Sequence, residues 1–501
     1  MPFDALSLSV IALAALLLVA ATVGRPLSFR VAAIVVAALI IRGDAAFQRG
    51  LHTWDESYHA LVAKNLISDP LRPTLYKRPA LAFDLKDWTA NHVWLHKPPG
   101  ALWLMAGSMA ALGVNELGLR LPSVILSSAA VILTFLIGRA LFGERVGLLA
   151  AAFHALNGFL VALAAGRRVA DHVDTTLTVF VELAVWAVIL YRTTRTPAWL
   201  VVCGVSMGFA FLTKSLPALI VLPVAFVALP PAVSRADRVR LCLWVALVAA
   251  AVAAPWTIFA ARRYPAEAAW AFEYTLMHMT QTVEGHATSV LTYVRDLPRF
   301  FGELSPAVVL VAGVIALRDP RQAGLRLLVV WAGLVYVVFS LMATRLPGYV
   351  MIAAPALFLM QAWAWVALRD RLPEMSSRVA RLVTAGALVL MAALPARHLL
   401  EPTGPLERRD RFPEVVERAK RIQLQLGLPD AVLFNVPSAI EVMFYSPYTA
   451  YERMPTDQEV KALVARGLPV VIYQGVYRPV AIPGDWPVIV LSDDNSRTRQ
   501  Q

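Results

Sequence analysis

The sequence WDESYHALVAKNLISDP (residues 54–70) opens a polar interval that closes with HKPPG (residues 96–100). Apolar stretches typical of membrane helices lie on both sides of it. Irregular backbone that faces lipid would leave its amide groups unpaired. The interval therefore lies outside the hydrocarbon or lines a wet cavity. Its carboxylates at one end and its lysine at the other mark it as a working surface.

The overall composition lies outside the range of soluble globular proteins. The chain has 501 residues, of which 58% are hydrophobic and 16% charged, and its mean hydropathy is +0.62. The net charge of +12 comes mostly from short loops, where a topology signal explains it better than nucleic-acid binding. Cys203 and Cys242 each lie in an apolar run, which excludes a disulfide framework. The first apolar run lacks a basic start, which favours a retained helix over a signal peptide.

The apolar runs predict an α-helical polytopic membrane protein with about twelve transmembrane helices. They cover residues 6–23, 29–47, 121–139, 147–165, 174–191, 198–213, 216–232, 240–259, 304–317, 326–343, 348–368 and 379–396. Arg42 and Asp44 make the second run the weakest. Residues 98–113 are short for a span, and we expect a helix there that lies along the membrane surface.

Arginine placement predicts the orientation of these helices. Alternate loops are short and basic, as with Arg139 and Arg145, and the positive-inside rule makes them cytoplasmic. The opposite loops hold the chemically interesting residues, so we expect the working face to be periplasmic or extracellular. We expect a transmembrane domain over residues 1–396, with its first external loop at 48–120. Alternating helical and β-branched runs predict a small α/β accessory domain over 397–501.

Two charged groups bracket the polar interval. Asp55 and Glu56 head an amphipathic segment, where a carboxylate either acts as a general base or simply favours the helix N-terminus through the macrodipole. Lys97 follows His96 and precedes two prolines that stiffen the turn. Lysine is a common phosphate partner, and snorkelling to lipid headgroups is the alternative explanation.

A second group follows the fourth predicted span. Arg167 and Arg168 run against the positive-inside trend there, so we expect an anionic phosphate or nearby carboxylates as their partners. Asp171 and Asp174 share a helix face. With His172 they could bind a divalent metal, and an ion pair with one of the arginines explains them equally well.

Further candidates lie on the same predicted side of the membrane. Lys214 interrupts two apolar runs, and an ionisable residue at such depth is a functional candidate. RLPGY (residues 345–349) places Arg345 beside Tyr349. The loop 260–303 could contact a ligand's hydroxyl groups or a metal, although its first glutamates are also typical of a solvated helix face. It carries Glu267, Glu273, His278, Glu284 and His286.

These motifs together resemble those of the glycosyltransferase C (GT-C) superfamily. DESY (55–58) and KPPG (97–100) are followed by GVNE (113–116), RLPS (120–123) and GRALFG (138–143). Over residues 50–355 the order is most similar to that of lipid A aminoarabinose transferases, which are related to protein O-mannosyltransferases. The family commonly has glutamate where His96 precedes Lys97 here, and the first span looks like an addition.

The resemblance implies an inverting transfer of a sugar from a polyprenyl-phosphate carrier to an acceptor. The acceptor would be a glycolipid such as lipopolysaccharide, or alternatively a secreted protein, at the outer face of a bacterial inner membrane. No cofactor is implied with certainty, and a divalent metal stays open. A transporter or flippase of lipid-linked saccharides is the alternative, although the chain lacks the internal repeat that transporters usually show.

We therefore expect three groups of site residues. The catalytic group is Asp55, which would activate the acceptor, with Glu56 and Lys97. Cations and an aromatic residue would meet the carrier phosphate and stabilise its developing charge: Arg167, Arg168, Lys214, Arg345 and Tyr349. The sugar or the acceptor would contact His96, Asp171, Asp174, Glu273, His278, Glu284 and His286.

Overall fold

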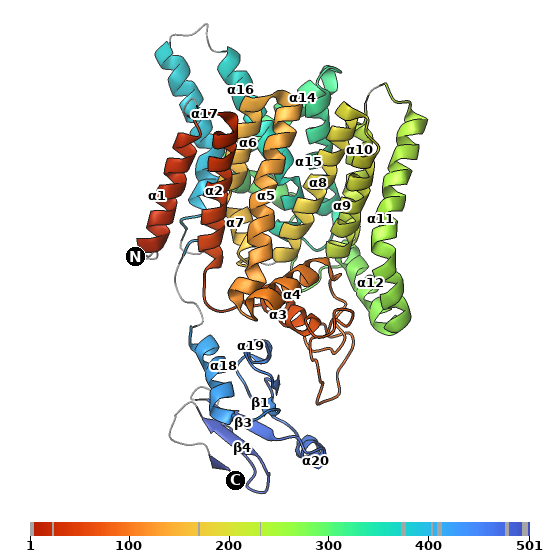
Figure 1. The fold of residues 1–501 in the computed structure, drawn as a ribbon, viewed down its shortest axis with the longest axis vertical. Coiled ribbons are helices and arrows are strands. Elements are labelled where there is room, and N and C mark those ends of the chain that lie inside the picture. Colours follow the sequence, from red (N-terminus) through yellow and green to blue (C-terminus); the bar gives the residue numbers. More distant parts are fainter. Residues whose placement is uncertain are drawn as a thin grey trace.

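The computed structural model describes residues 5–22, 25–168, 171–230, 232–371, 377–401, 404–407, 413–475, 480–492 and 499–500. Long helices stand side by side in the part before residue 400 (Figure 1). The first of them are α1 (Ala5–Ala20), α2 (Leu27–Ala46), α5 (Glu116–Phe142), α6 (Glu144–Leu156), α7 (Gly158–Ala164), α8 (His172–Thr194), α9 (Ala198–Lys214), η1 (Leu216–Ile220) and α10 (Val221–Ala228). The others are α11 (Arg235–Arg263), α14 (Ser305–Arg318), α15 (Ala323–Leu341), η2 (Pro347–Ala353), α16 (Ala354–Arg371) and α17 (Ser377–Arg397).

Helices occupy all of the apolar runs that the sequence predicts as spans. By length and composition alone, six helices in the described ranges could cross a membrane, or up to eight if each bent pair is one span. The bent pairs are α6 with α7, at 58°, and α13 (Thr292–Phe301) with α14, at 107°. The prediction of a polytopic helical membrane fold is confirmed, and the count of about twelve spans stays a prediction.

Shorter elements gather at one end of the bundle (Figure 1). They are α3 (Asp55–Leu66), α4 (Gly100–Leu112) and α12 (Pro265–Thr280). Between α3 and α4 the chain is irregular apart from a single bridge that pairs Thr74 with Val93. Helices therefore form both in the amphipathic segment after Asp55 and at residues 98–113, as the sequence predicts.

From residue 413 onward, the described part of the chain forms helices and a five-stranded sheet. The helices are α18 (Pro413–Leu426), α19 (Ala439–Tyr445) and α20 (Asp457–Ala465), and the strands are β1 (Val432–Phe434), β2 (Thr449–Ala450), β3 (Val470–Gln474), β4 (Ile489–Ser492) and β5 (Arg499–Gln500). The strand order is β2-β1-β3-β4-β5, and only the pairing of β4 with β5 is antiparallel. Parallel strands joined by helices explain the alternating pattern in the sequence.

This α/β part packs directly onto the first external loop. One buried apolar cluster contains Leu61 of α3 and Leu102 of α4 together with Ile422 of α18 and Phe444 of α19. Tyr76 of the same cluster stacks on Tyr451, with ring centroids 5.2 Å apart. Because burying aromatic and aliphatic surface stabilises packing, the external loop and the α/β part share one core.

Candidate active site

The candidate site begins at the first residue of α3. Trp54 precedes it with φ of 69° and ψ of −127°, and Asp55 then starts the helix, half-buried. The Asp55 carboxylate is close enough to interact electrostatically with Lys97, Tyr274 and Tyr349, which come from three different segments. The fold thus brings the residues at the two ends of the polar interval together, as the sequence predicts.

Left-handed backbone is concentrated around this site. In the described chain five residues other than glycine have positive φ, and three of them are Trp54 before Asp55, Ser215 after Lys214, and Glu284. Side chains with a Cβ rarely adopt this region, and its cost is retained only where surrounding structure enforces it. The strain marks these positions as ones that the tertiary structure holds in place.

Lys97 reaches the site on a turn that packs closely against the end of α9. A Cβ built on Gly100 would lie 2.8 Å from the Leu212 carbonyl oxygen, so only glycine permits this approach. The Lys97 ammonium donates to His96 Nε2 at 2.9 Å. Burial lowers the pKa of Lys97; the Asp55 carboxylate opposes this shift, and the Lys214 ammonium adds to it. Lys97 is therefore a cation that a further anion would stabilise.

Lys214 forms the second cation of the site. Its ammonium donates to Asp174 Oδ1 at 2.5 Å and lies 4.4 Å from the centroid of the Tyr349 ring. The other Asp174 oxygen, Oδ2, is buried and has no hydrogen-bond partner within the described residues. A hydroxyl group of a bound ligand could donate to it. The sequence suggested an arginine as partner for Asp174, and the structure shows Lys214 instead.

Aromatic side chains form a wall around Glu284. Its Oε1 accepts from Trp88 Nε1 at 2.9 Å and from the Tyr274 hydroxyl at 2.8 Å. Trp88 also stacks on His96, with centroids 4.6 Å apart and planes at 10°. His286 Nε2 lies 4.0 Å from Glu284 Oε2. The structure thus brings the predicted Glu284 and His96 together through Trp88 and Tyr274, which the sequence analysis had not selected.

His278 lies next to this wall, with its ring centroid 5.1 Å from that of Tyr274. Its Nδ1 donates to the Tyr274 carbonyl oxygen at 2.8 Å. Burial lowers the pKa of His278, as it does for His96, where the Lys97 ammonium adds to the effect. A neutral His96 explains why its Nε2 accepts a hydrogen bond from Lys97.

Glu56 lies in a buried network of its own. Its Oε1 accepts from Arg120 Nε at 2.6 Å and lies 3.1 Å from His172 Nε2, and its Oε2 accepts from the His52 amide at 2.6 Å. Gly166, at φ of +73°, leaves no room for a Cβ beside this carboxylate. Burial opposes ionisation, but the Arg120 guanidinium outweighs it and lowers the pKa of Glu56. Both oxygens of Glu56 are therefore already bound within this network.

Asp171 links α3 to α8. Its Oδ1 lies 3.0 Å from His59 Nδ1, and both side chains are buried. The same oxygen accepts from the Val173 amide at 3.3 Å and so caps α8. In the described part of the chain, no group of three or more His, Cys, Asp or Glu residues is arranged to hold a metal ion.

Arg167 and Arg168 bind the connection that leads to the α/β part. Arg167 donates to the carbonyl oxygens of Gly404 and, at 2.6 Å, of Glu407. Arg168 Nη2 lies 2.9 Å from His398 Nε2. The two arginines thus contact backbone and histidine groups, and their contact with the carrier phosphate stays a prediction.

Arg345 and Glu273 are the remaining predicted residues. Arg345 donates to the carbonyl oxygens of Ser340 at 3.0 Å and Thr288 at 2.5 Å, and so ties the loop after Glu284 to the end of α15. Glu273 is exposed on α12. The exposure of Glu273 agrees with the alternative interpretation from the sequence, a solvated helix face.

Comparisons with known proteins point to one group of enzymes. Residues 96–259 match the model of a family described as dolichyl-phosphate-mannose-protein mannosyltransferase. An undecaprenyl phosphate-alpha-4-amino-4-deoxy-L-arabinose arabinosyl transferase of Pseudomonas fluorescens is 30% identical over 59% of this chain and 51% of its own length. One of Pseudomonas aeruginosa is 29% identical over 53% of this chain and 49% of its own length. The chain resembles GT-C glycosyltransferases. It spans about half the length of these relatives.

Solved structures share the GT-C fold. ArnT from Cupriavidus metallidurans bound to undecaprenyl phosphate has a TM-score of 0.62 at 17% identity, covering 88% of this chain and 89% of that one. The Archaeoglobus fulgidus oligosaccharyltransferase in its apo form has a TM-score of 0.55 at 13% identity, covering 86% of this chain and 65% of that one. Since similarity at such low identity is a property of the backbone, the residues above must carry the chemical argument.

Proposed function

We propose that the protein is an inverting glycosyltransferase that moves a sugar from a polyprenyl-phosphate carrier to an acceptor. The acceptor we favour is a glycolipid such as lipopolysaccharide, with a secreted protein as the second choice. The proposed location is the outer face of a bacterial inner membrane. The observation that carries the proposal is the meeting of two ammonium groups, Lys97 and Lys214, with the carboxylates of Asp55 and Asp174.

The proposed reaction assigns one role to each charge. Asp55 accepts the proton of the acceptor's hydroxyl or amine while that atom attacks the anomeric carbon. The bond between the anomeric carbon and the phosphate oxygen breaks, and the carrier phosphate leaves with the electron pair. Lys97 and Lys214 stabilise the negative charge that develops on it. Asp174 Oδ2, which has no partner within the described residues, accepts a hydrogen bond from a hydroxyl group of the sugar.

The state of Lys97 supports its assignment to the phosphate. An ammonium group has three donor hydrogens, and one of them forms the hydrogen bond to His96 Nε2. Burial disfavours the charged form of Lys97, so a phosphate beside it would replace the solvation that it has lost. This gain grows as the phosphate becomes more negative in the transition state, which is the condition for catalysis.

Other predicted residues receive positioning roles in this proposal. Glu56 fixes the first turn of α3 through Arg120, because both of its oxygens are bound. Arg345 fixes the loop that carries Glu284. Arg167 and Arg168 anchor the α/β accessory domain, for which we propose residues 397–501.

The direct test is transfer by the full-length protein in membranes supplied with a polyprenyl-phosphate sugar. We expect Asp55→Asn to abolish the sugar-sized mass increase on glycolipids while carrier binding persists. Glu273→Gln, which changes an exposed carboxylate on α12, is the matched control and should transfer normally. If the folded wild-type protein adds mass to neither glycolipids nor proteins, the enzyme proposal fails and a transporter becomes the better explanation.

A further inference from the structure

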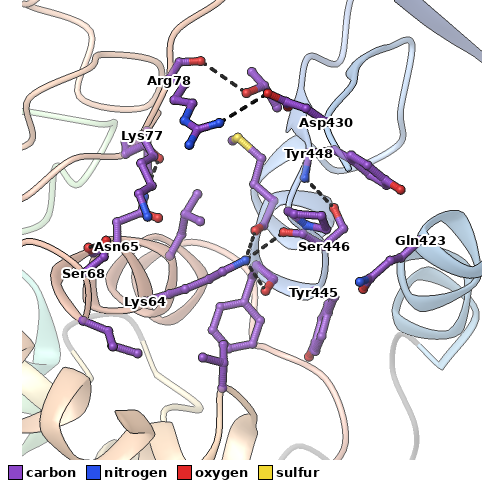
Figure 2. A pocket seen from close by; sticks show the side chains of 18 of the residues that line it. Lys64, Asn65, Ser68, Lys77, Arg78, Gln423, Asp430, Tyr445, Ser446 and Tyr448 are labelled. Atoms are coloured by element: carbon purple, nitrogen blue, oxygen red, sulfur yellow. Dashed lines mark hydrogen bonds and ion pairs between the residues drawn. The ribbon is translucent and has the colours of Figure 1, made fainter. Parts of the chain in front are cut away.

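A cavity lies between the first external loop and the α/β part. It has a volume of about 710 Å³ and is lined by α3, residues 67–78, α18, α19 and the turn after α19 (Figure 2). Its size is within the range of small-molecule sites. The proposed transfer reaction does not use it.

Positive charge dominates the lining of this cavity. Its charged residues are Lys64, Lys77, Arg78, Lys420 and Asp430. Asn65, Ser68 and Ser446 add neutral polar groups. Four cations face one carboxylate, so the cavity favours an anion over a neutral or cationic ligand.

The partners of these cations show which of them hold the structure together. Lys64 donates to the carbonyl oxygens of Met443, Phe444 and Ser446 at 2.6–2.9 Å and so caps the C-terminus of α19 (Figure 2). Arg78 pairs with Asp430 at 3.3 Å. These two residues join the external loop to the α/β part.

The other two cations are Lys77 and Lys420. Lys420 lies over the Tyr445 ring, 5.0 Å from its centroid, and within electrostatic reach of the Glu116 carboxylate, whereas Lys77 is exposed. They come from two segments of the lining, Lys420 from α18 and Lys77 from the external loop. Either ammonium group can donate charge-assisted hydrogen bonds to an anion held in the cavity.

We propose that this cavity binds a phosphate-class anion through Lys77 and Lys420. The site is separate from the proposed donor site, because Lys64 lies nine residues beyond Asp55 and α3 rises 1.5 Å per residue, which separates them by roughly 13 Å. The anion is either the headgroup of a membrane lipid or free inorganic phosphate. This inference goes beyond the proposed transfer reaction and does not depend on it.

The first arm of the test measures inorganic phosphate binding by the full-length protein in phosphatidylcholine nanodiscs. We expect saturable binding that Lys77→Gln combined with Lys420→Gln weakens about tenfold or more, since hydrogen bonds to charged groups are strong. Lys461→Gln is the matched control. It removes an exposed lysine of the same α/β part outside the cavity and should leave binding unchanged. If the double variant does not fold, phosphate binding is measured with Lys77→Gln alone. Lys77 is exposed, so its substitution should not prevent folding.

The second arm separates the two sources of the anion. Phosphatidic acid is added to the nanodiscs, and phosphate binding is measured again. Competition would identify a lipid headgroup as the occupant, and unchanged binding would identify free phosphate. The proposal is overturned if phosphate does not bind saturably, or if it binds equally well to the wild type and the lysine variants.

Discussion

The Lys214 ammonium and the Asp174 carboxylate form an ion pair at 2.5 Å between α9 and α8. Their side chains are 14% and 2% exposed, so the pair is largely removed from water. Removing one member of such a pair leaves an uncompensated charge, which is far more costly than removing both. The pair therefore gives a test that separates stability from catalysis.

We expect Lys214→Met to destabilise the protein by about 3–5 kcal/mol, because Asp174 would be left as a buried carboxylate without its cation. Adding Asp174→Asn should restore most of this stability, since no buried charge then remains. Transfer should stay lost in the double variant if Lys214 stabilises the departing phosphate. Thermal unfolding in detergent and the transfer assay measure the two effects. Full activity in the stable double variant would contradict the role of Lys214.

The close approach of the Lys97 turn to α9 predicts the effect of one methyl group. Gly100→Ala would place a Cβ 2.8 Å from the Leu212 carbonyl oxygen and force α4 away from α9. We expect a loss of about 1–3 kcal/mol in stability and reduced transfer, because Lys97 would move with the turn. Gly107→Ala in the same helix is the control. No neighbouring atom lies within 4 Å of the added Cβ, so Gly107→Ala should increase the free energy of unfolding by up to about 1 kcal/mol. Equal effects of the two substitutions would be inconsistent with the packing argument.

The contact between His59 and Asp171 predicts a pH dependence of stability. Burial disfavours the imidazolium, but the Asp171 carboxylate outweighs it and raises the pKa of His59 above 6.5. A raised pKa means that the folded protein binds a proton more tightly than the unfolded chain. The stabilisation by His59 is therefore complete below pH 6.5 and is lost as the pH rises through the folded-state pKa.

Replacing His59 measures this contribution. The difference in unfolding free energy between the wild type and His59→Gln should be largest in acid and shrink with increasing pH. For His278→Gln the same difference should instead increase with pH, because burial lowers the pKa of His278. A difference for His59→Gln that does not vary with pH would show that the histidine acts by packing alone.

Glu441 in α19 predicts a second pH effect. It is 4% exposed, its Oε2 has no hydrogen-bond partner in the described part of the chain, and burial raises its pKa to about 7. The folded protein then keeps a proton that the unfolded chain releases between pH 4.5 and about pH 7, so stability falls with pH across this window. Above this pH window, Glu441→Gln should stabilise the folded protein by about 2–3 kcal/mol, and below the window it should have little effect.

The control for Glu441 is Glu459→Gln. Glu459 pairs with Arg453, whose hydrogen bonds lower the pKa of this carboxyl to about 2. Glu459→Gln should therefore destabilise the folded protein. This loss should be complete above pH 4.5 and should disappear as the pH falls through about 2. Chemical denaturation of the full chain across the pH range measures both variants. A uniform gain from Glu441→Gln at every pH would argue for better packing rather than for a lost buried charge.

Hydropathy and charge placement were enough to predict the helical membrane fold, the position of the helices that frame the external loop, and the alternation of helices and strands after residue 413. These features depend on local patterns of apolar residues, which the sequence contains directly. The short elements α19, β2 and β5 were not part of that prediction. The motifs around Asp55 and Lys97 also identified the ends of the polar interval as one site, and the two residues do lie within electrostatic reach.

The partners of these residues were decided only by the tertiary structure. Neighbours in sequence were separated, as Glu56 turned to Arg120 while Asp55 faced Lys97. Asp174 was paired with Lys214 rather than with an arginine, and Trp88 was brought to Glu284 across the site. A hydropathy pattern determines that a helix buries one face, but the rotation and approach of packed helices determine which charges meet. The sequence by itself therefore determined which elements form and which residue types they carry, and the packing of those elements decided which of them share a site.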